Sequence, residues 1–357
     1  MEILPRRELI SVALTITCII AAGFPAAAQE VIRVQTELVS LNVVVMDREG
    51  RRVSGLLKED FEVFEDDSRQ EITHFSADER PLRLVLVFDL SLSMEAVLPT
   101  VKQGALTLLG SLRQDDEVSI VSFATDVRAL SGWLKAEQAR DIINNLEAEP
   151  HPQPQASTIF RHGWRVGDGN TFLYEAFQYV FDHFKSGDDR IAIIMFSDGV
   201  DTGAGRDVRM IKKRVDGIGK EVMRQAQESW GLVYPIRYKT EQIIGDLPAA
   251  ASRPFPSIAL HIGSAPADPG RGFFAKIVAA SGGAIFDWTT RADLLLAVGN
   301  VLADLRSQYG VGYRPPLKNE ASFRRLKVRV KRPNLVVRTR EGYIYRQPVR
   351  PRRATSP

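Results

Sequence analysis

The chain has 357 residues, of which 44% are hydrophobic and 25% charged, and its formal net charge at pH 7 is +3. This composition is typical of a globular chain with one large domain or two modest ones rather than a disordered one, and the small net charge gives no reason to invoke nucleic acid. The only cysteine, Cys18, lies near the N-terminus. Disulfides, cysteine catalysis, zinc-thiolate sites and iron–sulfur clusters are therefore excluded from the remainder of the chain.

Residues 1–28 are expected to be a secretory signal peptide. Arginines at positions 6 and 7 precede an apolar stretch over residues 9–24, and the run PAAA at 25–28 offers the small residues that signal peptidase accepts. A membrane anchor is the alternative, but the apolar stretch is shorter than the roughly 20 residues of a spanning helix. No later segment is long and apolar enough to span a membrane. We therefore expect an exported protein, either periplasmic or extracellular.

Residues 29–80 are expected to form a β segment. In LVSLNVVVMDREGRRV, apolar residues at alternate positions from Val39 to Val45 share one strand face, and the DREG sequence at 47–50 suits a hairpin turn. The stretch DFEVFEDDSRQEITHF predicts further short strands. This segment is interpreted as part of a small β-sandwich, without residues suited to chemistry.

Residues 81–312 show strands alternating with helices. LRLVLVFD is a nearly continuous apolar run, typical of a parallel strand buried on both faces, and similar strands are expected in EVSIVSFAT, RIAIIMFSD, GLVYPIRY and GAIFD. Helical periodicity separates them, including a charged helix from about residue 207 to 229. The repeated units predict an α/β fold with a doubly wound, mainly parallel, Rossmann-like sheet. Residues 149–166 and 240–269, rich in proline, are interpreted as a loop and an insertion.

Residues 313–347 return to β character. In FRRLKVRVKR, one strand face is apolar and the other carries Lys327, Arg329 and Lys331. The basic face is interpreted as the solvated side of an edge strand, and contact with nucleic acid or an anionic cell surface is the alternative. NLVVRTREGYIY is expected to supply one partner strand, and the Pro/Arg-rich tail 348–357 is expected to be disordered.

Oxygen-bearing side chains gather at the carboxyl edge of the predicted sheet. In VLVFDLSLSM, Asp89 ends the first parallel strand, and Ser91 and Ser93 follow at alternate positions. GNTFLYEAF places Thr171 at the start of a helix, and IIMFSDGVD places Asp198 at the end of a buried strand. Because ligands of such sheets collect outside the carboxyl ends of the strands, these residues are expected to face one point. Carboxylate and hydroxyl oxygens suit Mg²⁺, with Mn²⁺ or Ca²⁺ as substitutes.

A D-x-S-x-S triplet alone occurs by chance, and Ser or Asp after a strand commonly caps a turn or helix, which is how Asp201 is interpreted. The downstream threonine and aspartate favour the metal site. With these residues the chain resembles the von Willebrand factor A-type domain over 82–312, and the pattern matches that family's metal-ion-dependent adhesion site. Leu92 departs from the family, where glycine is common at this variable position.

The resemblance implies a role for each residue. The two serines of the triplet would bind the metal directly, Thr171 directly or through water, and Asp89 and Asp198 largely through water. One coordination position would stay open for a carboxylate of a partner. The flanks GLLKEDFEVFEDDSRQEITHF and YGVGYRPP…GYIY are also similar to a bacterial group of secreted von Willebrand factor A-related proteins, which implies that the two β segments belong together around the α/β domain.

These features together indicate a secreted, non-enzymatic module for protein binding or adhesion, in which Mg²⁺ captures an Asp or Glu of a protein partner. The alternative is a structural or assembly protein of an envelope complex, whose metal only rigidifies the loops. A metal-dependent hydrolase is the third hypothesis. It is disfavoured because Ser91 stands where haloacid dehalogenase-type enzymes have a second Asp, and because G-x-S-x-G, H-E-x-x-H and G-x-x-x-x-G-K motifs are absent from the sequence.

Overall fold

The computed structural model describes residues 38–77, 81–148, 160–161, 164–165, 171–184, 191–201, 213–229, 231–239, 269–316 and 322–345. All of them belong to the unit Glu37–Pro357. The expected signal peptide 1–28, residues 240–268 of the expected insertion and the tail 348–357 lie outside the described residues, so these three assignments stay predictions. No helix within the described ranges is long and apolar enough to cross a membrane.

The α/β part of the chain is built on a six-stranded sheet. All neighbouring strands are parallel except the last pair, which is antiparallel. The order across the sheet is β12 (Phe286–Trp288), β11 (Leu232–Tyr238), β10 (Ile191–Ser197), β5 (Arg83–Asp89), β6 (Glu117–Phe123) and β7 (Val127–Ala129). Every residue of β10 and β11 is buried, as their continuous apolar runs predict.

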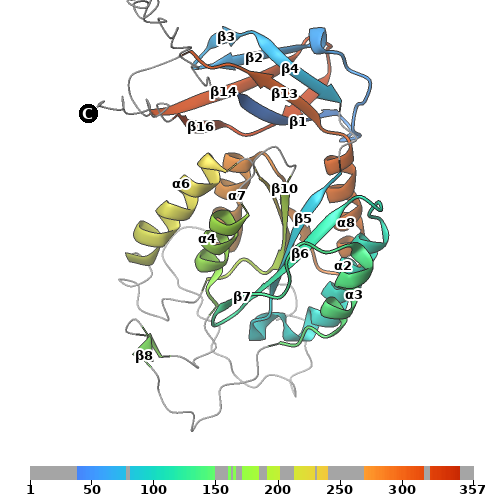
Figure 1. Ribbon diagram of the computed structural model, residues 1–357, viewed down its shortest axis with the longest axis vertical. Coiled ribbons are helices and arrows are strands. Elements are labelled where there is room, and N and C mark those ends of the chain that lie inside the picture. The colour runs from blue at the N-terminus through green and yellow to red at the C-terminus, as the bar shows by residue number, and fades with distance from the viewer. Residues whose placement is uncertain are drawn as a thin grey trace, which may run out of the picture. The chain divides into compact units, whose positions relative to one another are not determined.

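Helices cover both faces of this sheet (Figure 1). One face packs against α2 (Leu98–Gly110), α3 (Ala136–Asn144) and α8 (Arg291–Arg306). The other packs against α4 (Leu173–His183), α6 (Lys220–Glu228) and α7 (Pro269–Ser281). Two short helical segments, η2 (Leu92–Val97) and the π-helical η3 (Val215–Gly219), precede α2 and α6. The arrangement confirms the predicted doubly wound α/β fold.

The N- and C-terminal strands form two antiparallel four-stranded sheets. The first has the order β15 (Leu335–Arg338), β1 (Val39–Asp47), β13 (Tyr309–Tyr313) and β4 (Ile72–Ala77). The second has the order β16 (Gly342–Tyr345), β14 (Ser322–Val330), β2 (Phe61–Glu65) and β3 (Ser68–Gln70). Both sheets contribute buried side chains to one core, which includes Leu41, Val63, Val311 and Leu326, so the expected β-sandwich is present.

Three details of the sandwich refine the sequence interpretation. Strand β13 pairs with β1 and β4, so the expected boundary after residue 312 falls inside it. Strand β14 pairs with β16 over Ser322–Arg325 and with β2 over Leu326–Val330, so the half that carries Lys327 and Arg329 is paired with β2. The segment NLVVRTREGYIY forms two strands, because β15 pairs with β1 whereas β16 pairs with β14.

The remaining short elements are η1 (Lys58–Asp60) and the paired two-residue strands β8 (Phe160–Arg161) and β9 (Trp164–Arg165).

A buried ion pair lies inside the sandwich. The buried Arg324 donates to Glu65 Oε1 at 2.5 Å, and the hydroxyls of Tyr313 and Tyr343 donate to Glu65 Oε2 at 2.5 and 2.9 Å. A charged pair at this depth is tolerated because both carboxylate oxygens are hydrogen-bonded.

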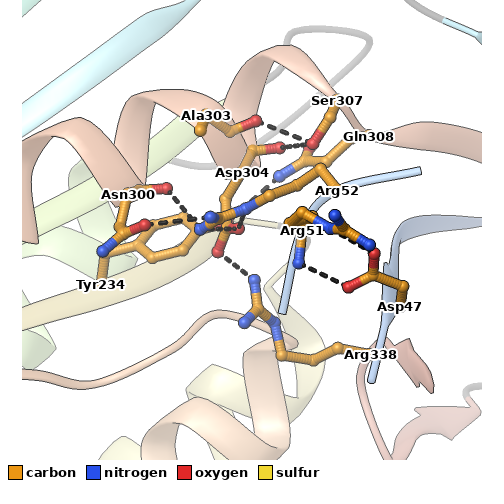
Figure 2. A network of polar contacts seen from close by, with 10 residues as sticks. All are labelled: Asp47, Arg51, Arg52, Tyr234, Asn300, Ala303, Asp304, Ser307, Gln308 and Arg338. Carbon is orange, nitrogen blue, oxygen red and sulfur yellow. Dashed lines mark hydrogen bonds and ion pairs between the residues drawn. The ribbon is translucent and has the colours of Figure 1, made fainter. Parts of the chain in front are cut away.

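Ion pairs join the sandwich strands to helix α8 (Figure 2). The Asp304 carboxylate is fully buried and accepts a 2.9 Å hydrogen bond from Arg52 Nε, while Arg338 donates to its other oxygen. Arg52 Nη1 also donates to Asn300 Oδ1 at 2.9 Å. These contacts fix α8 against the segment after β1 and the end of β15.

Candidate functional site

The order in which successive strands are added to the large sheet reverses next to β5. From β5 the chain moves outward to β6 and β7, and it then returns to β10 on the other side of β5. The register pairs Phe88 with Phe196, so Asp89 and Ser197 end neighbouring parallel strands at the same edge. Such a topological switch point is where ligands bind in doubly wound sheets, because the two outgoing loops separate there.

The carboxylate of Asp89 is held from both sides. Its Oδ1 accepts a 3.0 Å hydrogen bond from the Ser91 backbone N–H, and its Oδ2 accepts a 2.6 Å bond from the Ser197 hydroxyl. The Ser91 and Ser93 hydroxyl oxygens lie 3.2 Å apart. Asp89 and Ser91 are buried, whereas Ser93 is exposed. The triplet therefore forms a small polar cluster that reaches from the buried end of β5 to the surface.

Asp198 directly follows strand β10 and contacts this cluster. Its carboxylate accepts a hydrogen bond from the Ser93 side chain and a 3.0 Å bond from the Val200 backbone N–H. Gly199 has a φ of +83°, a conformation that glycine adopts without strain, and its N–H donates to Ser197 Oγ at 2.9 Å. This tight turn directs the Asp198 carboxylate to Ser93 rather than away from the sheet.

Thr171 is brought to the same edge by a backbone bond. The Phe172 N–H donates to the Ala124 carbonyl at 2.9 Å, and the Leu90 N–H donates to the adjacent Phe123 carbonyl at 2.8 Å. The segment carrying Thr171 and the segment carrying the two serines are thus anchored to consecutive residues at the end of β6. Thr171 itself is buried. Direct contacts join the other four predicted residues, whereas Thr171 is brought to the same edge of the sheet through the backbone of its neighbour Phe172.

Burial and like charge perturb the two acids. Burial raises the pKa of Asp89 to about 7, the negative charge of Asp198 adds to this rise, and the hydrogen bonds from Ser197 and Ser91 oppose it. Burial also raises the pKa of Asp198, against the bonds from Val200 and Ser93 and the charge of Arg237. Two buried carboxylates that repel each other, next to neutral hydroxyls, form a donor set that fits a hard divalent cation.

Asp201 has a different role from the other acids. Its Oδ2 accepts a 3.1 Å hydrogen bond from the Tyr174 N–H in the first turn of α4, and its Oδ1 pairs with Arg214 Nε at 2.9 Å. The carboxylate therefore caps a helix, in agreement with its interpretation as a cap.

Two residues that interact with the site carboxylates were not predicted from the sequence. Ser197 is the only hydroxyl in the otherwise apolar run IAIIMFS, and Arg237 is a single charge in the apolar strand GLVYPIRY. Arg237 is only 5% exposed and its Nε donates to Asp287 at 2.7 Å. In each case the sequence feature that could have revealed the residue is a polar side chain within an apolar run, which is typical of a strand covered on both faces.

Among the residues that the structure describes, no group of three or more His, Cys, Asp or Glu side chains is arranged to hold a metal. Within the described part of the chain, the site at the β5–β10 edge contains two carboxylates. An ion bound there would rely on the hydroxyls of Ser91, Ser93 and Thr171 for further oxygen ligands.

Comparison with known proteins supports the fold. The family model described as von Willebrand factor type A domain matches residues 84–200, which include all five candidate residues. The α/β part of the chain has the fold of that family, whose domains generally take part in protein interaction or adhesion, are typically non-enzymatic and often bind a divalent metal. Comparison with curated protein sequences finds no match.

Solved structures resemble the chain only distantly. A von Willebrand factor type A protein from Catenulispora acidiphila is 9% identical, with 85% of this chain and 73% of that chain covered and a TM-score of 0.41. Conserved hypothetical protein BatB from Bacteroides thetaiotaomicron is 15% identical, with 63% and 100% covered and a TM-score of 0.41. Proximal thread matrix protein 1 from the mussel byssus, with a zinc-occupied adhesion motif, is 12% identical, with 69% and 50% covered and a TM-score of 0.41. At these TM-scores the likenesses support no assignment of function.

Proposed function

We propose that the chain is an exported protein-binding module whose adhesion site holds a divalent metal ion, Mg²⁺ in the first instance, and captures an Asp or Glu side chain of a protein partner. The observation that carries the proposal is the set of contacts among Asp89, Ser91, Ser93 and Asp198 at the switch point of the sheet. Thr171, whose neighbour Phe172 is bonded to the end of β6, would complete the donor set.

Each residue of the site would have a distinct role in binding the ion. Ser91, Ser93 and Thr171 would offer neutral oxygens to the ion, and the carboxylates of Asp89 and Asp198 would act from behind them, largely through water. Ser197 and the Ser91 N–H orient the Asp89 carboxylate by occupying one lone pair on each oxygen. When bound, the metal supplies a Lewis-acidic position that a carboxylate can occupy.

The charge balance of the site favours an acidic ligand. Hydroxyl ligands do not neutralise the cation, and part of the charge of Asp198 is offset by the nearby Arg237. A partner carboxylate would therefore find an incompletely neutralised ion. We propose a non-enzymatic role, because domains of the family whose model matches residues 84–200 are typically interaction modules.

The second candidate function is a structural module of an envelope assembly, in which the metal only rigidifies the loops. It is favoured by the ion pairs that tie the β-sandwich to α8 through Asp304, because they make the α/β part and the flanks one continuous structure. In that case the metal would stabilise the protein without changing the affinity of the site for acidic ligands.

Retention on two immobilised peptide libraries tests the proposal. One library carries a Glu at its central position and the other a Gln, with the flanking residues randomised. We expect the mature chain to be retained by the Glu library in Mg²⁺ and released by EDTA, and to pass through the Gln library. Equal retention in EDTA would contradict metal-dependent capture. Metal binding without selective retention by Glu would favour the structural module instead.

A further inference from the structure

A buried ion cluster lies beside the candidate site but contains none of its five residues. Arg214 Nε and Nη2 donate to Asp201 Oδ1 and Oδ2 at 2.9 and 3.1 Å, and Nη1 donates to Glu175 Oε1 at 2.5 Å. Arg214 Nη2 also contacts the second oxygen of Glu175. The Arg214 and Asp201 side chains are 9% and 8% exposed, so this is a largely buried pair and not a surface salt bridge.

The cluster joins the two chain segments that supply the last two site residues. Asp201 lies three residues after Asp198, and Tyr174 lies three residues after Thr171. The hydrogen bond from the Tyr174 N–H to Asp201 Oδ2 is therefore a direct link between the loop after β10 and the first turn of α4. A shift in this link would move Thr171 and Asp198 relative to each other.

Arg214 stabilises that link by charge and by packing. Its guanidinium neutralises Asp201 and Glu175 together, and it lies 5.1 Å from the ring centroid of Phe172 and 5.7 Å from that of Tyr174. Phe172 directly follows Thr171. Without the guanidinium, two neighbouring acids would repel each other at the start of α4. Lysine could not replace it fully, because an ammonium group cannot bind both carboxylates in the same planar geometry.

We propose that Arg214 is a positioning residue for the candidate metal site, acting through Asp201 and the first turn of α4 to keep Thr171 and Asp198 in register. The proposal rests on the proposed metal site. It is consistent with the position of Arg214 directly before the π-helical segment Val215–Gly219, since π-helical turns are frequent at functional sites.

Titration calorimetry with Mn²⁺ tests this role. We expect Arg214→Gln to weaken Mn²⁺ binding by about 10-fold, the lower end of the effect of losing a direct partner of a metal ligand, because Arg214 acts one step further out. Arg214→Lys should give an intermediate affinity. The matched control is Arg224→Gln, because Arg224 also pairs with two carboxylates, Glu221 and Glu228, but on the surface of α6. The control should bind Mn²⁺ as the wild type does.

A double-mutant cycle separates positioning from general loss of stability. If Arg214 acts through Asp201, then Arg214→Gln combined with Asp201→Asn should weaken Mn²⁺ binding little more than either change alone. Additive effects would overturn the proposed route, and unchanged affinity in Arg214→Gln would overturn the role itself. If Arg214→Gln does not fold, as judged by thermal unfolding in EDTA, the cycle is run with Arg214→Lys. A wild type that binds no metal would instead overturn the proposed function and this inference with it.

Discussion

The Ser197 hydroxyl donates a 2.6 Å hydrogen bond to Asp89 Oδ2, across the boundary between strands β10 and β5. The same hydroxyl accepts the Gly199 N–H at 2.9 Å, so one side chain orients the Asp89 carboxylate and also holds the turn that carries Asp198. Because both Asp89 oxygens already accept hydrogen bonds from the protein, this carboxylate is suited to act on an ion through water.

Ser197→Ala is expected to weaken metal binding about 10-fold, because Asp89 loses its orienting donor. The matched control is Ser119→Ala, since Ser119 is also a buried strand serine, and its hydroxyl donates to the Ser131 carbonyl at 3.0 Å away from the five candidate residues. Both variants should lose stability to a similar extent. Equal metal affinity in the two variants, measured by calorimetry, would show that Ser197 has only a structural role.

The metal-free protein is expected to lose stability at this site as the pH rises from about 4 to about 7. The folded-state pKa of Asp89 is raised to about 7 from 3.8, chiefly by burial and then by the charge of Asp198. In this range the folded protein therefore binds a proton that the unfolded chain has released, and folding becomes less favourable with increasing pH. Asp89→Asn removes this titration.

Thermal unfolding at pH 5 and pH 8 in EDTA measures the effect. The wild type should lose more stability between these two pH values than Asp89→Asn does, and Mg²⁺ should restore the wild type at pH 8. An identical pH dependence in both proteins would mean that the pKa of Asp89 is not raised in the folded protein.

Asp304→Asn is expected to lower the free energy of unfolding by about 3–5 kcal/mol, because it leaves Arg52 and Arg338 without a charged partner at a fully buried position. Asp47→Asn is the control, since its partner Arg51 in the same view is 76% exposed, and it should cost much less than Asp304→Asn (Figure 2). Denaturant unfolding of both variants gives the comparison. Similar losses would contradict the structural importance of the contact with α8.

Gly283→Ala is expected to destabilise the fold by roughly 1–3 kcal/mol or more, because a Cβ there would lie 1.8 Å from the Val233 carbonyl oxygen, between α7 and strand β11. Gly299→Ala is the opposite case. Gly299 lies in α8 with no atom within 4 Å of an added Cβ, so alanine should stabilise the helix by about 1 kcal/mol. Melting temperatures of the two variants should shift in opposite directions, and a common direction would contradict the packing at Gly283.

The large sheet could be predicted because its apolar runs are long and its helices lie regularly between them. Strand partners in the sandwich could not, because a period of two residues fixes which side chains share a face but not which strand lies alongside. Strand β14 illustrates this, since its alternation shows one apolar and one basic face but not that β16 pairs with its first half and β2 with its second. The buried Arg324 shares the apolar face of that strand, and its pairing with Glu65 depends on a residue 259 positions away.

The candidate site was predictable as far as its motif, because each of its residues follows a strand or begins a helix at the carboxyl edge of the sheet. The pairing of Arg214 with Asp201 was not, because these two residues contact each other only after the loop from β10 and the segment before α6 have folded together. The positions of the two residues along the chain do not indicate that contact.

Titration of Mg²⁺ into the mature chain, beside Asp89→Ala and Thr171→Ala variants whose folding is verified by circular dichroism, tests the central claim most directly. The account predicts one bound ion in the wild type and loss of binding in both folded variants. If the wild type binds no ion, or if the variants bind it equally well, the cluster at the β5–β10 edge is not a metal site.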